Sequence, residues 1–296
     1  MHLIATLIAP PGKRPPSAEA ALAIIAHGGE VLEEAWVEPG VAFDVHFSGG
    51  DADEIRFILH TLADRAGVDM VLQPGPRRAK KLLVSDMDST IIEQECIDEL
   101  AACVGLKKKV AAITARAMNG EIDFADALRA RVALLKGLTT ADLQRVLDAR
   151  ITLMPGAATL IATLKARGVY CLLVSGGFTF FTRIVRDRAG FDRDEANILL
   201  MDDGVLTGAV VEPILGSEAK LAALKRYAKQ QGITLTKTIA IGDGANDLPM
   251  IQAAGMGIAY HAKPTVEAAA PARIRHNDLT ALLYVLGIPK REWAGE

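Results

Sequence analysis

Three short apolar runs, each followed at once by polar or glycine-rich residues, constrain the fold of this 296-residue chain most strongly. The loops after runs 81–85, 169–174 and 238–241 are Asp86-Met87-Asp88-Ser89-Thr90, Ser175-Gly176-Gly177 and Gly242-Asp243-Gly244-Ala245-Asn246-Asp247. Helical patterns alternate with these predicted strands, which indicates a doubly wound, parallel α/β sheet. Because such sheets bind ligands outside the carboxyl ends of their strands, we expect all three loops at one edge.

The first 76 residues follow a different pattern. We predict strands at 2–8, 30–37, 42–47 and 68–72 and helices at 17–26 and 54–66. This βαββαβ order is typical of a small ferredoxin-like α+β domain. The following Gln73-Pro74-Gly75-Pro76 breaks both helix and strand, so we predict two domains, 1–76 and 77–296.

Within the second domain, a mostly helical insertion of about residues 93–150 separates the first strand from the rest of the sheet. Its helices are predicted at 93–104, 107–119, 124–135 and 141–149. Later helices are expected at 157–167, 180–188, 218–231, 248–254 and 279–286, and a short strand at 257–259. A hairpin is expected to turn at Asp203-Gly204, a preferred dipeptide for a two-residue turn.

Composition excludes several classes of protein. The 33 Lys and Arg residues do not exceed the 36 Asp and Glu residues, so nucleic acid is not the expected partner. No run of 18 apolar residues is present, so we expect no membrane span. The three cysteines form no CxxC pair, and the N-terminus lacks the basic-then-apolar order of a signal peptide. We therefore expect a cytoplasmic protein with reduced, buried thiols and a small-molecule substrate.

Four carboxylates at one sheet edge repel one another unless a cation is present; they belong to Asp86, Asp88, Asp243 and Asp247. Oxygen ligands favour Mg²⁺ over zinc, and the six histidines lack zinc-site spacing. Mg²⁺ beside glycine-rich backbone amides suits a phosphate group.

Lys220 supports the prediction of a phosphate site. It lies in the first turn of a predicted helix, where a cation meets the positive end of the helix dipole unless an anion is close. The alternative is an exposed lysine, as we expect Lys225 and Lys229 to be.

These elements together resemble the four signatures of the haloacid dehalogenase-like phosphatases. The matching positions, in order, are Asp86-x-Asp88-x-Thr90, Ser175, Lys220 and Gly242-Asp243-x-x-x-Asp247. The resemblance implies that Asp86 attacks phosphorus to form an aspartyl-phosphate, while Asp88 acts as general acid and then general base. It also implies a Mg²⁺ ion held by the Asp86 and Asp243 side chains and the Asp88 backbone carbonyl.

The same resemblance gives roles to the remaining polar groups. Ser175, Lys220 and backbone amides near Ser89 and Gly176 would stabilise the phosphate oxygens. Asn246 would hydrogen-bond near the phosphate or the metal shell. Asp247 would orient Lys220 or a metal-bound water.

Within this superfamily, three segments resemble the phosphoserine phosphatases: 93–101, 118–124 and 128–135. The similarity extends from about Lys81 to Leu286. It implies that the insertion is a cap in which Glu95 binds the substrate ammonium, Arg131 binds its carboxylate, and Met118 and Phe124 form an apolar lid. Arg129 is expected to face solvent.

Each of these assignments has a plain alternative. Glu95 would be an exposed helix residue, and Arg131 would pair with Glu99 or another surface acid. Met118 and Phe124 would be helix-packing core residues.

The first 76 residues resemble the ACT-like domain that precedes some phosphoserine phosphatases. Such domains pair through their sheets or bind amino acids. Residues 9–13 after the first strand lack a clear glycine-rich ligand loop, so a homodimer contact or a scaffold is at least as well supported as ligand sensing.

The expected function is therefore Mg²⁺-dependent hydrolysis of O-phosphoserine to serine and phosphate, the last step of serine biosynthesis. Alternatives are a related small-phosphate phosphatase, a phosphotransferase that uses the same aspartyl-phosphate, or a serine-sensing regulatory protein. The sequence leaves oligomeric state, rates, stereoselectivity and feedback inhibition open.

Overall fold

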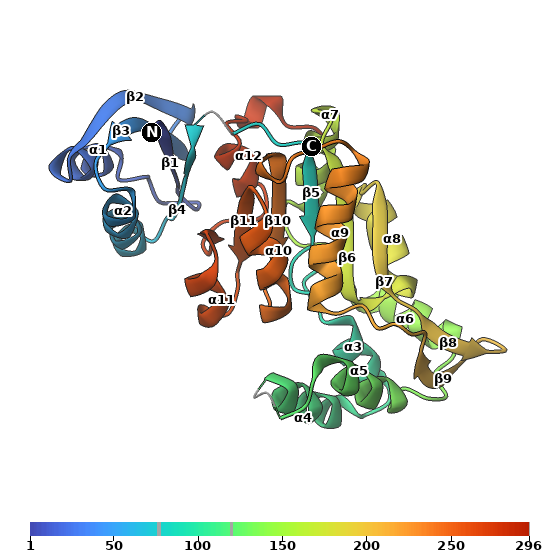
Figure 1. The fold of residues 1–296 in the computed structure, drawn as a ribbon. Coiled ribbons are helices and arrows are strands. Elements are labelled where there is room, and N and C mark those ends of the chain that lie inside the picture. The colour runs from blue at the N-terminus through green and yellow to red at the C-terminus, as the bar shows by residue number, and fades with distance from the viewer. Residues whose placement is uncertain (76–77, 119–120, 296) are drawn as a thin grey trace.

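The computed structural model describes residues 1–75, 78–118 and 121–295, and contains a four-stranded sheet, a six-stranded sheet and a hairpin (Figure 1). The predicted boundary at residue 76 lies outside the described residues. None of the helices in the described ranges combines the length and the apolar composition needed to cross a bilayer.

The N-terminal domain has the predicted βαββαβ order. Its elements are β1 (Leu3–Ile8), α1 (Ser17–Ala26), β2 (Gly29–Glu38), β3 (Ala42–Gly49), α2 (Ala52–Ala66) and β4 (Asp69–Pro74). The antiparallel sheet has the order β2-β3-β1-β4. Helix α2 begins after Asp51, whose carboxylate accepts hydrogen bonds from the amides of Asp53 and Glu54. One sheet face packs on both helices, for example through Phe47, Ile24 and Leu59.

The six-stranded sheet is parallel throughout, which confirms the doubly wound prediction. Its strands are β5 (Leu82–Ser85), β6 (Tyr170–Phe178), β7 (Arg193–Asn197), β10 (Thr238–Gly242), β11 (Met256–Tyr260) and β12 (Ala272–Ile274). The order is β12-β11-β10-β5-β6-β7, so β5 lies between β10 and β6.

Alternate side chains of each central strand point to opposite faces of this sheet, as a pleated strand requires. Leu82 and Val84 pack with residues of α9 (Ser217–Gln230) and α10 (Leu248–Ala253). Leu83 belongs to the other core cluster, with α7 (Ala157–Ala166), α8 (Thr179–Ala189) and α12 (Ala281–Val285). Both faces are therefore covered by helices (Figure 1).

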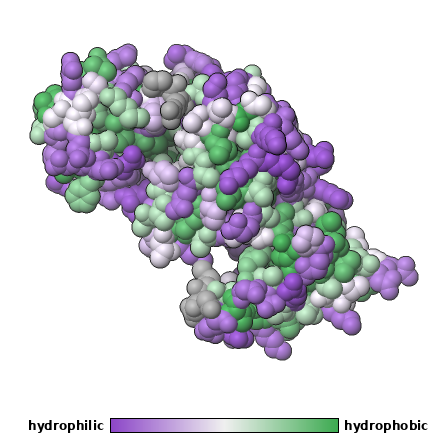
Figure 2. Space-filling view, in the orientation of Figure 1, coloured by the Kyte–Doolittle hydropathy of each residue, from purple (hydrophilic) through white to green (hydrophobic). Residues whose placement is uncertain are grey.

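The insertion after β5 contains the predicted four helices, as α3 (Cys96–Cys103), α4 (Lys107–Met118), α5 (Phe124–Ala133) and α6 (Thr140–Arg150). Helix α5 contacts a hairpin of β8 (Leu199–Asp202) and β9 (Val205–Val210). The hairpin turns at the predicted dipeptide, with φ of 45° at Asp203 and 75° at Gly204. In Figure 2 its tip is hydrophilic, while polar and apolar residues are interspersed over the rest of that face.

Three elements were not predicted. Strand β7 reads Arg-Asp-Glu-Ala-Asn, and it lacks an apolar pattern because it lies at the sheet edge. Helix α11 (Pro264–Ala269) and strand β12 are only a few residues long. The prediction of buried thiols was wrong for Cys103, which is exposed at the end of α3, whereas Cys96 and Cys171 are buried.

The N-terminal domain packs on the domain of the six-stranded sheet through the face of its own sheet that α1 and α2 leave uncovered. Ile8, Ala42 and Val71 belong to the same core cluster as α12. Buried Asp69 accepts hydrogen bonds from the backbone amides of Arg275, His276 and Asn277, among others. The two sheets are thus joined by a shared apolar core and a satisfied buried carboxylate.

Candidate active site

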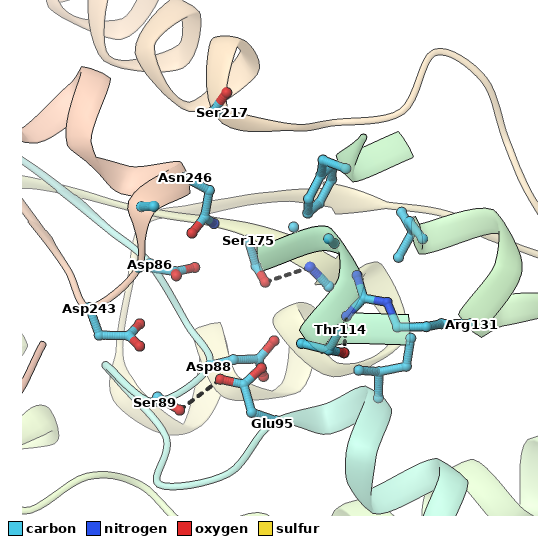
Figure 3. Close-up of a pocket in the computed structure, with 18 of the residues that line it drawn as sticks. Asp86, Asp88, Ser89, Glu95, Thr114, Arg131, Ser175, Ser217, Asp243 and Asn246 are labelled. Atoms are coloured by element: carbon cyan, nitrogen blue, oxygen red, sulfur yellow. Dashed lines mark hydrogen bonds between the residues drawn. The ribbon is translucent and has the colours of Figure 1, made fainter. Parts of the chain in front are cut away.

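The three predicted loops lie together because β10, β5 and β6 are neighbours in the sheet. Asp86 and Asp243 directly follow β5 and β10, whereas Ser175 lies within β6, which continues to Phe178. The prediction that 175–177 form a loop after the strand was therefore wrong. These three residues line a cavity of about 700 Å³ between this sheet edge and the insertion helices (Figure 3). We call the sheet side the strand wall: Asp86, Ser175 and Asp243 line the cavity there, and Lys220 and Asp247 are fully buried next to Asp86. The helix side, with Glu95, Asp98, Thr114 and Arg131, is the helix wall.

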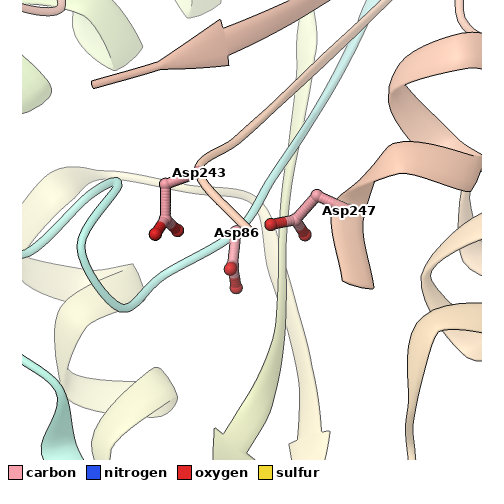
Figure 4. A group of neighbouring side chains, drawn as sticks. All are labelled: Asp86, Asp243 and Asp247. Atoms are coloured by element: carbon pink, nitrogen blue, oxygen red, sulfur yellow. The ribbon is translucent and has the colours of Figure 1, made fainter. Parts of the chain in front are cut away.

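A compact carboxylate group occupies the strand wall. One oxygen each of Asp86, Asp243 and Asp247 lies within 4.8 Å of the others (Figure 4). The pKa of Asp243 is raised to about 7, chiefly by burial and in addition by the charges of Asp86 and Glu95. Clustered hard oxygen donors that resist ionisation without a counter-charge fit a divalent cation such as Mg²⁺.

Lys220 lies between two of these carboxylates. Its Nζ is 2.8 Å from Oδ1 of Asp86 and 2.6 Å from Oδ1 of Asp247, and the side chain is fully buried. Burial alone would lower the pKa of Lys220, but the charges of Asp247 and Asp86 outweigh it and raise the pKa. The alternative of a surface lysine is therefore wrong for Lys220, whereas Lys225 and Lys229 are exposed as expected.

Asp247 is packed tightly beneath the loop that carries Asp243. Its Oδ2 accepts a hydrogen bond from the amide of Gly244 at 3.0 Å. A Cβ on Gly242 would lie 2.4 Å from the Asp247 carboxyl carbon, so only glycine fits there. With its oxygens used by Lys220 and Gly244, Asp247 supports the other groups of the strand wall.

Asp88, two residues after Asp86, lies in different surroundings. Its Oδ1 accepts a hydrogen bond from the Cys96 amide at the start of α3, at 3.2 Å. Burial raises its pKa well above the ordinary value, and the charges of Glu95 and Asp86 add to this effect. A carboxyl group whose pKa is raised in this way holds its proton more firmly and is suited to donate it to a leaving group.

Of the predicted phosphate-binding groups, Ser89, Ser175, Gly176 and Asn246 line the cavity, whereas Lys220 is buried next to Asp86. Oγ of Ser175 accepts a hydrogen bond from the Gly177 amide at 2.9 Å, which leaves the hydroxyl proton to donate. The Ser89 amide donates to the Gln94 carbonyl at 3.3 Å, so a phosphate role for that amide stays a prediction.

On the helix wall, Glu95 precedes α3 and faces the cavity. Its Oε1 accepts a hydrogen bond from the Ser89 hydroxyl at 2.7 Å (Figure 3). The pKa of Glu95 is raised, chiefly because surrounding protein removes water from the carboxylate. The charges of Asp86 and Asp98 add to this rise, and the hydrogen bond from Ser89 opposes it. Glu95 is exposed, as the alternative required, but it is exposed to this cavity.

Arg131 and Arg129, two residues apart on α5, have opposite surroundings. Arg131 lines the cavity, while Arg129 bonds Glu212 at 2.8 Å and Asp126 at 2.7 Å in solvent. The predicted alternative partner of Arg131, Glu99, instead pairs with Arg150 at 2.8 Å. Among the described residues, none forms an ion pair with Arg131.

Phe124 reaches from the first turn of α5 to the strand wall. A Cβ on Gly176 or Gly216 would lie 3.1 or 3.2 Å from its ring, so these glycines permit a close approach. The ring lines the cavity and also packs against the main core, so the lid and core assignments overlap. Met118 ends α4, and its side chain lies outside what the structure describes.

Sequence analysis missed two polar residues of the helix wall, Asp98 and Thr114. Asp98 follows the predicted site residue Glu95 by three residues, and Thr114 precedes the predicted site residue Met118 by four. Residues three or four apart share a helix face, so this spacing would have pointed to both.

Comparisons with known proteins agree with this geometry. The family model of haloacid dehalogenase-like hydrolases matches residues 83–252. A phosphoserine phosphatase of Polaromonas sp. is 49% identical over 211 residues, which cover 70% of this chain and 89% of that protein. A phosphoserine phosphatase of Streptomyces coelicolor is 44% identical over 256 residues, which cover 86% of this chain but 62% of that longer protein.

The fold has a close structural match over nearly its whole length. A crystal structure of a HAD family hydrolase from Salmonella enterica serovar Typhi has a TM-score of 0.86 and 31% identity, covering 96% of this chain and 98% of that one. The signatures gathered at one sheet edge, the matched family model and these relatives lead to one assignment. This chain belongs to the haloacid dehalogenase-like hydrolases and, among them, to the phosphoserine phosphatase family of enzymes.

Proposed function

We propose that this chain hydrolyses O-phosphoserine to L-serine and phosphate, as the last step of serine biosynthesis in the cytoplasm. One observation carries the proposal: a single cavity has phosphate-handling groups on one wall and a carboxylate and a guanidinium, Glu95 and Arg131, on the other. These groups complement the phosphate, ammonium and carboxylate of phosphoserine. The named activity of the relatives supports the same substrate.

Mg²⁺ is the proposed cofactor. The side chains of Asp86 and Asp243 and the backbone carbonyl of Asp88 would hold it, since both oxygens of Asp247 already accept hydrogen bonds, from Lys220 and from the Gly244 amide. When bound, Mg²⁺ would neutralise negative charge on the phosphate oxygens.

The first half of the reaction uses the two aspartates of the first loop. An oxygen of Asp86 attacks phosphorus, a bond to phosphorus forms, and the bond between phosphorus and the serine oxygen breaks. Asp88, whose pKa is raised, gives its proton to that leaving oxygen. Lys220 and Ser175 stabilise the phosphoryl oxygens during the transfer.

The second half restores the enzyme. Asp88, now ionised, takes a proton from a water molecule that attacks phosphorus, and the bond to Asp86 breaks to release phosphate. Lys220, buried between two carboxylates, keeps Asp86 oriented in both halves. A serine-sensing protein without catalysis would have no need of this arrangement.

The proposal extends to the rest of the chain. Helices α3 to α5 act as a cap over the cavity, and the N-terminal domain, which ends near residue 76, acts as a scaffold or homodimer contact.

Phosphate release from phosphoserine, phosphothreonine and phosphoglycolate tests the activity. We expect phosphoserine to react fastest, because phosphoglycolate lacks the ammonium that Glu95 would bind and phosphothreonine adds a methyl group. Equal or faster release from phosphoglycolate would contradict the proposal.

A further inference from the structure

Thr114 of α4 contacts Arg131 of α5 across the helix wall. Its hydroxyl donates to the Val110 carbonyl, one turn earlier on α4, at 3.2 Å. A hydroxyl has a single proton, so only its lone pairs remain for the second contact. That contact is a hydrogen bond from Nη1 of Arg131 at 3.4 Å (Figure 3).

Arg131 is held at two points. Its Nε donates to the Ala127 carbonyl on its own helix at 3.2 Å, and its Nη1 donates to Thr114 on the neighbouring helix. An arginine has five N–H donors in a fixed, planar fork. Two tethers on different helices fix the plane of the guanidinium, while its other donors remain for a ligand in the cavity.

The charge of Arg131 is left for such a ligand. The side chain is half-buried, and burial lowers its pKa. Asp98 on α3 lines the same cavity, and its charge opposes this effect of burial without an ion pair within 4 Å. Three helices thus present an oriented cation to the cavity.

We propose that Thr114 is a positioning residue that makes the enzyme selective for substrates with a carboxylate, by fixing the Arg131 guanidinium toward it. The inference rests on the proposed function, in which Arg131 binds the carboxylate of phosphoserine. Thr114 itself touches no reacting atom.

Two substitutions separate this role from packing. Thr114→Val keeps the shape of the side chain and removes the hydroxyl, whereas Thr114→Ser keeps the hydroxyl. We expect Thr114→Val to raise KM for phosphoserine about tenfold with kcat nearly unchanged, since a hydrogen bond to a charged group is lost. Thr114→Ser should restore most of the wild-type KM.

Phosphoethanolamine, which has the phosphate and ammonium but no carboxylate, is the control substrate. Its KM should change by less than about twofold in Thr114→Val, because Arg131 has no carboxylate to bind. Thr61→Val is the matched control variant. The Thr61 hydroxyl also donates to the carbonyl one turn earlier, at 2.9 Å, but Thr61 lies at an exposed position of α2 in the other domain. Thr61→Val should leave the KM for both substrates unchanged.

The results distinguish failure of this inference from failure of the proposed function. A wild-type enzyme with no preference for phosphoserine over phosphoethanolamine overturns both this inference and the proposed function. Two results overturn this inference alone: Thr114→Val keeps the full wild-type preference for phosphoserine over phosphoethanolamine, or its KM rises equally for both substrates. If Thr114→Val does not fold, as judged by circular dichroism, Thr114→Ala is measured in its place against the same criteria.

Discussion

The strand wall and the helix wall of the cavity are built in opposite ways. On the strand wall, Asp86, Lys220 and Asp247 are buried and satisfy one another through contacts of 2.6 to 2.8 Å. On the helix wall, Glu95 and Arg131 are more exposed and have few protein partners. The groups proposed for the chemistry are therefore prearranged, whereas the groups proposed to select the substrate would receive their ionic partners from the substrate itself.

Asp86→Asn tests the strand wall and should have the largest effect. The amide is a poor nucleophile, so kcat should fall by about 10⁴-fold or more while the fold persists. Phosphate release measures kcat, and circular dichroism shows whether the fold persists. The control is Asp202→Asn, at an exposed hairpin position, which should change neither kcat nor the fold. Substantial turnover by Asp86→Asn would show that another group attacks phosphorus.

Arg131→Ala tests the helix wall. Loss of a charged, two-pronged contact with a carboxylate should lower kcat/KM for phosphoserine about 100-fold. The loss with phosphoethanolamine should be much smaller, because that substrate has no carboxylate. Parallel losses with both substrates would mean that the two walls do not divide their roles as the structure suggests.

Mg²⁺ and protons should compete for the carboxylate of Asp243 on the strand wall. Chelation of divalent cations should stop turnover, and added Mg²⁺ should restore it. Because the pKa of Asp243 is raised to about 7, its carboxylate is ionised above this pH and protonated below it. The Mg²⁺ concentration for half-maximal rate should thus rise about tenfold per pH unit below about pH 7 and level off above it.

Titration of the rate with Mg²⁺ at several pH values checks this prediction. A Mg²⁺ requirement that stays constant between pH 5 and pH 8 would exclude Asp243 as a ligand whose protonation limits binding.

Arg129→Ala should have the smallest effect. Its side chain pairs with Glu212 and Asp126 in solvent, away from the cavity. We expect kcat/KM for phosphoserine to change by less than about twofold, since exposed ion pairs contribute little. A loss comparable to that of Arg131→Ala would show that general charge on α5, rather than one oriented guanidinium, attracts the substrate.

The sequence predicted the strand wall better than the helix wall, for a physical reason. The apolar runs that precede Asp86, Ser175 and Asp243 correctly predict three neighbouring strands, although β6 continues past Ser175 to Phe178. Helix faces depend on how α3, α4 and α5 pack together, so Thr114 had no local signal beyond its spacing. Edge strand β7 was missed because charge, rather than apolar alternation, fills it.

Buried Asn197, at the end of β7, illustrates what such local patterns leave out. Its side chain donates to the carbonyl of Gly176 at 2.9 Å and accepts from the amide of Leu215 at 2.7 Å. It joins the part of β6 just after Ser175 to the segment that leads into α9 and Lys220. Nothing in the isolated segment 193–197 indicates that link.

The packing of the N-terminal sheet limits how two chains can associate. The sheet face that α1 and α2 leave open is occupied by the chain's own catalytic domain, through Ile8, Ala42 and Val71. Two chains therefore cannot stack these faces without separating the domains first. The free edge is β2, where Leu32 is 52% exposed and Trp36 is 45% exposed. A symmetric pair formed there would extend the two sheets into one continuous sheet and leave both cavities free.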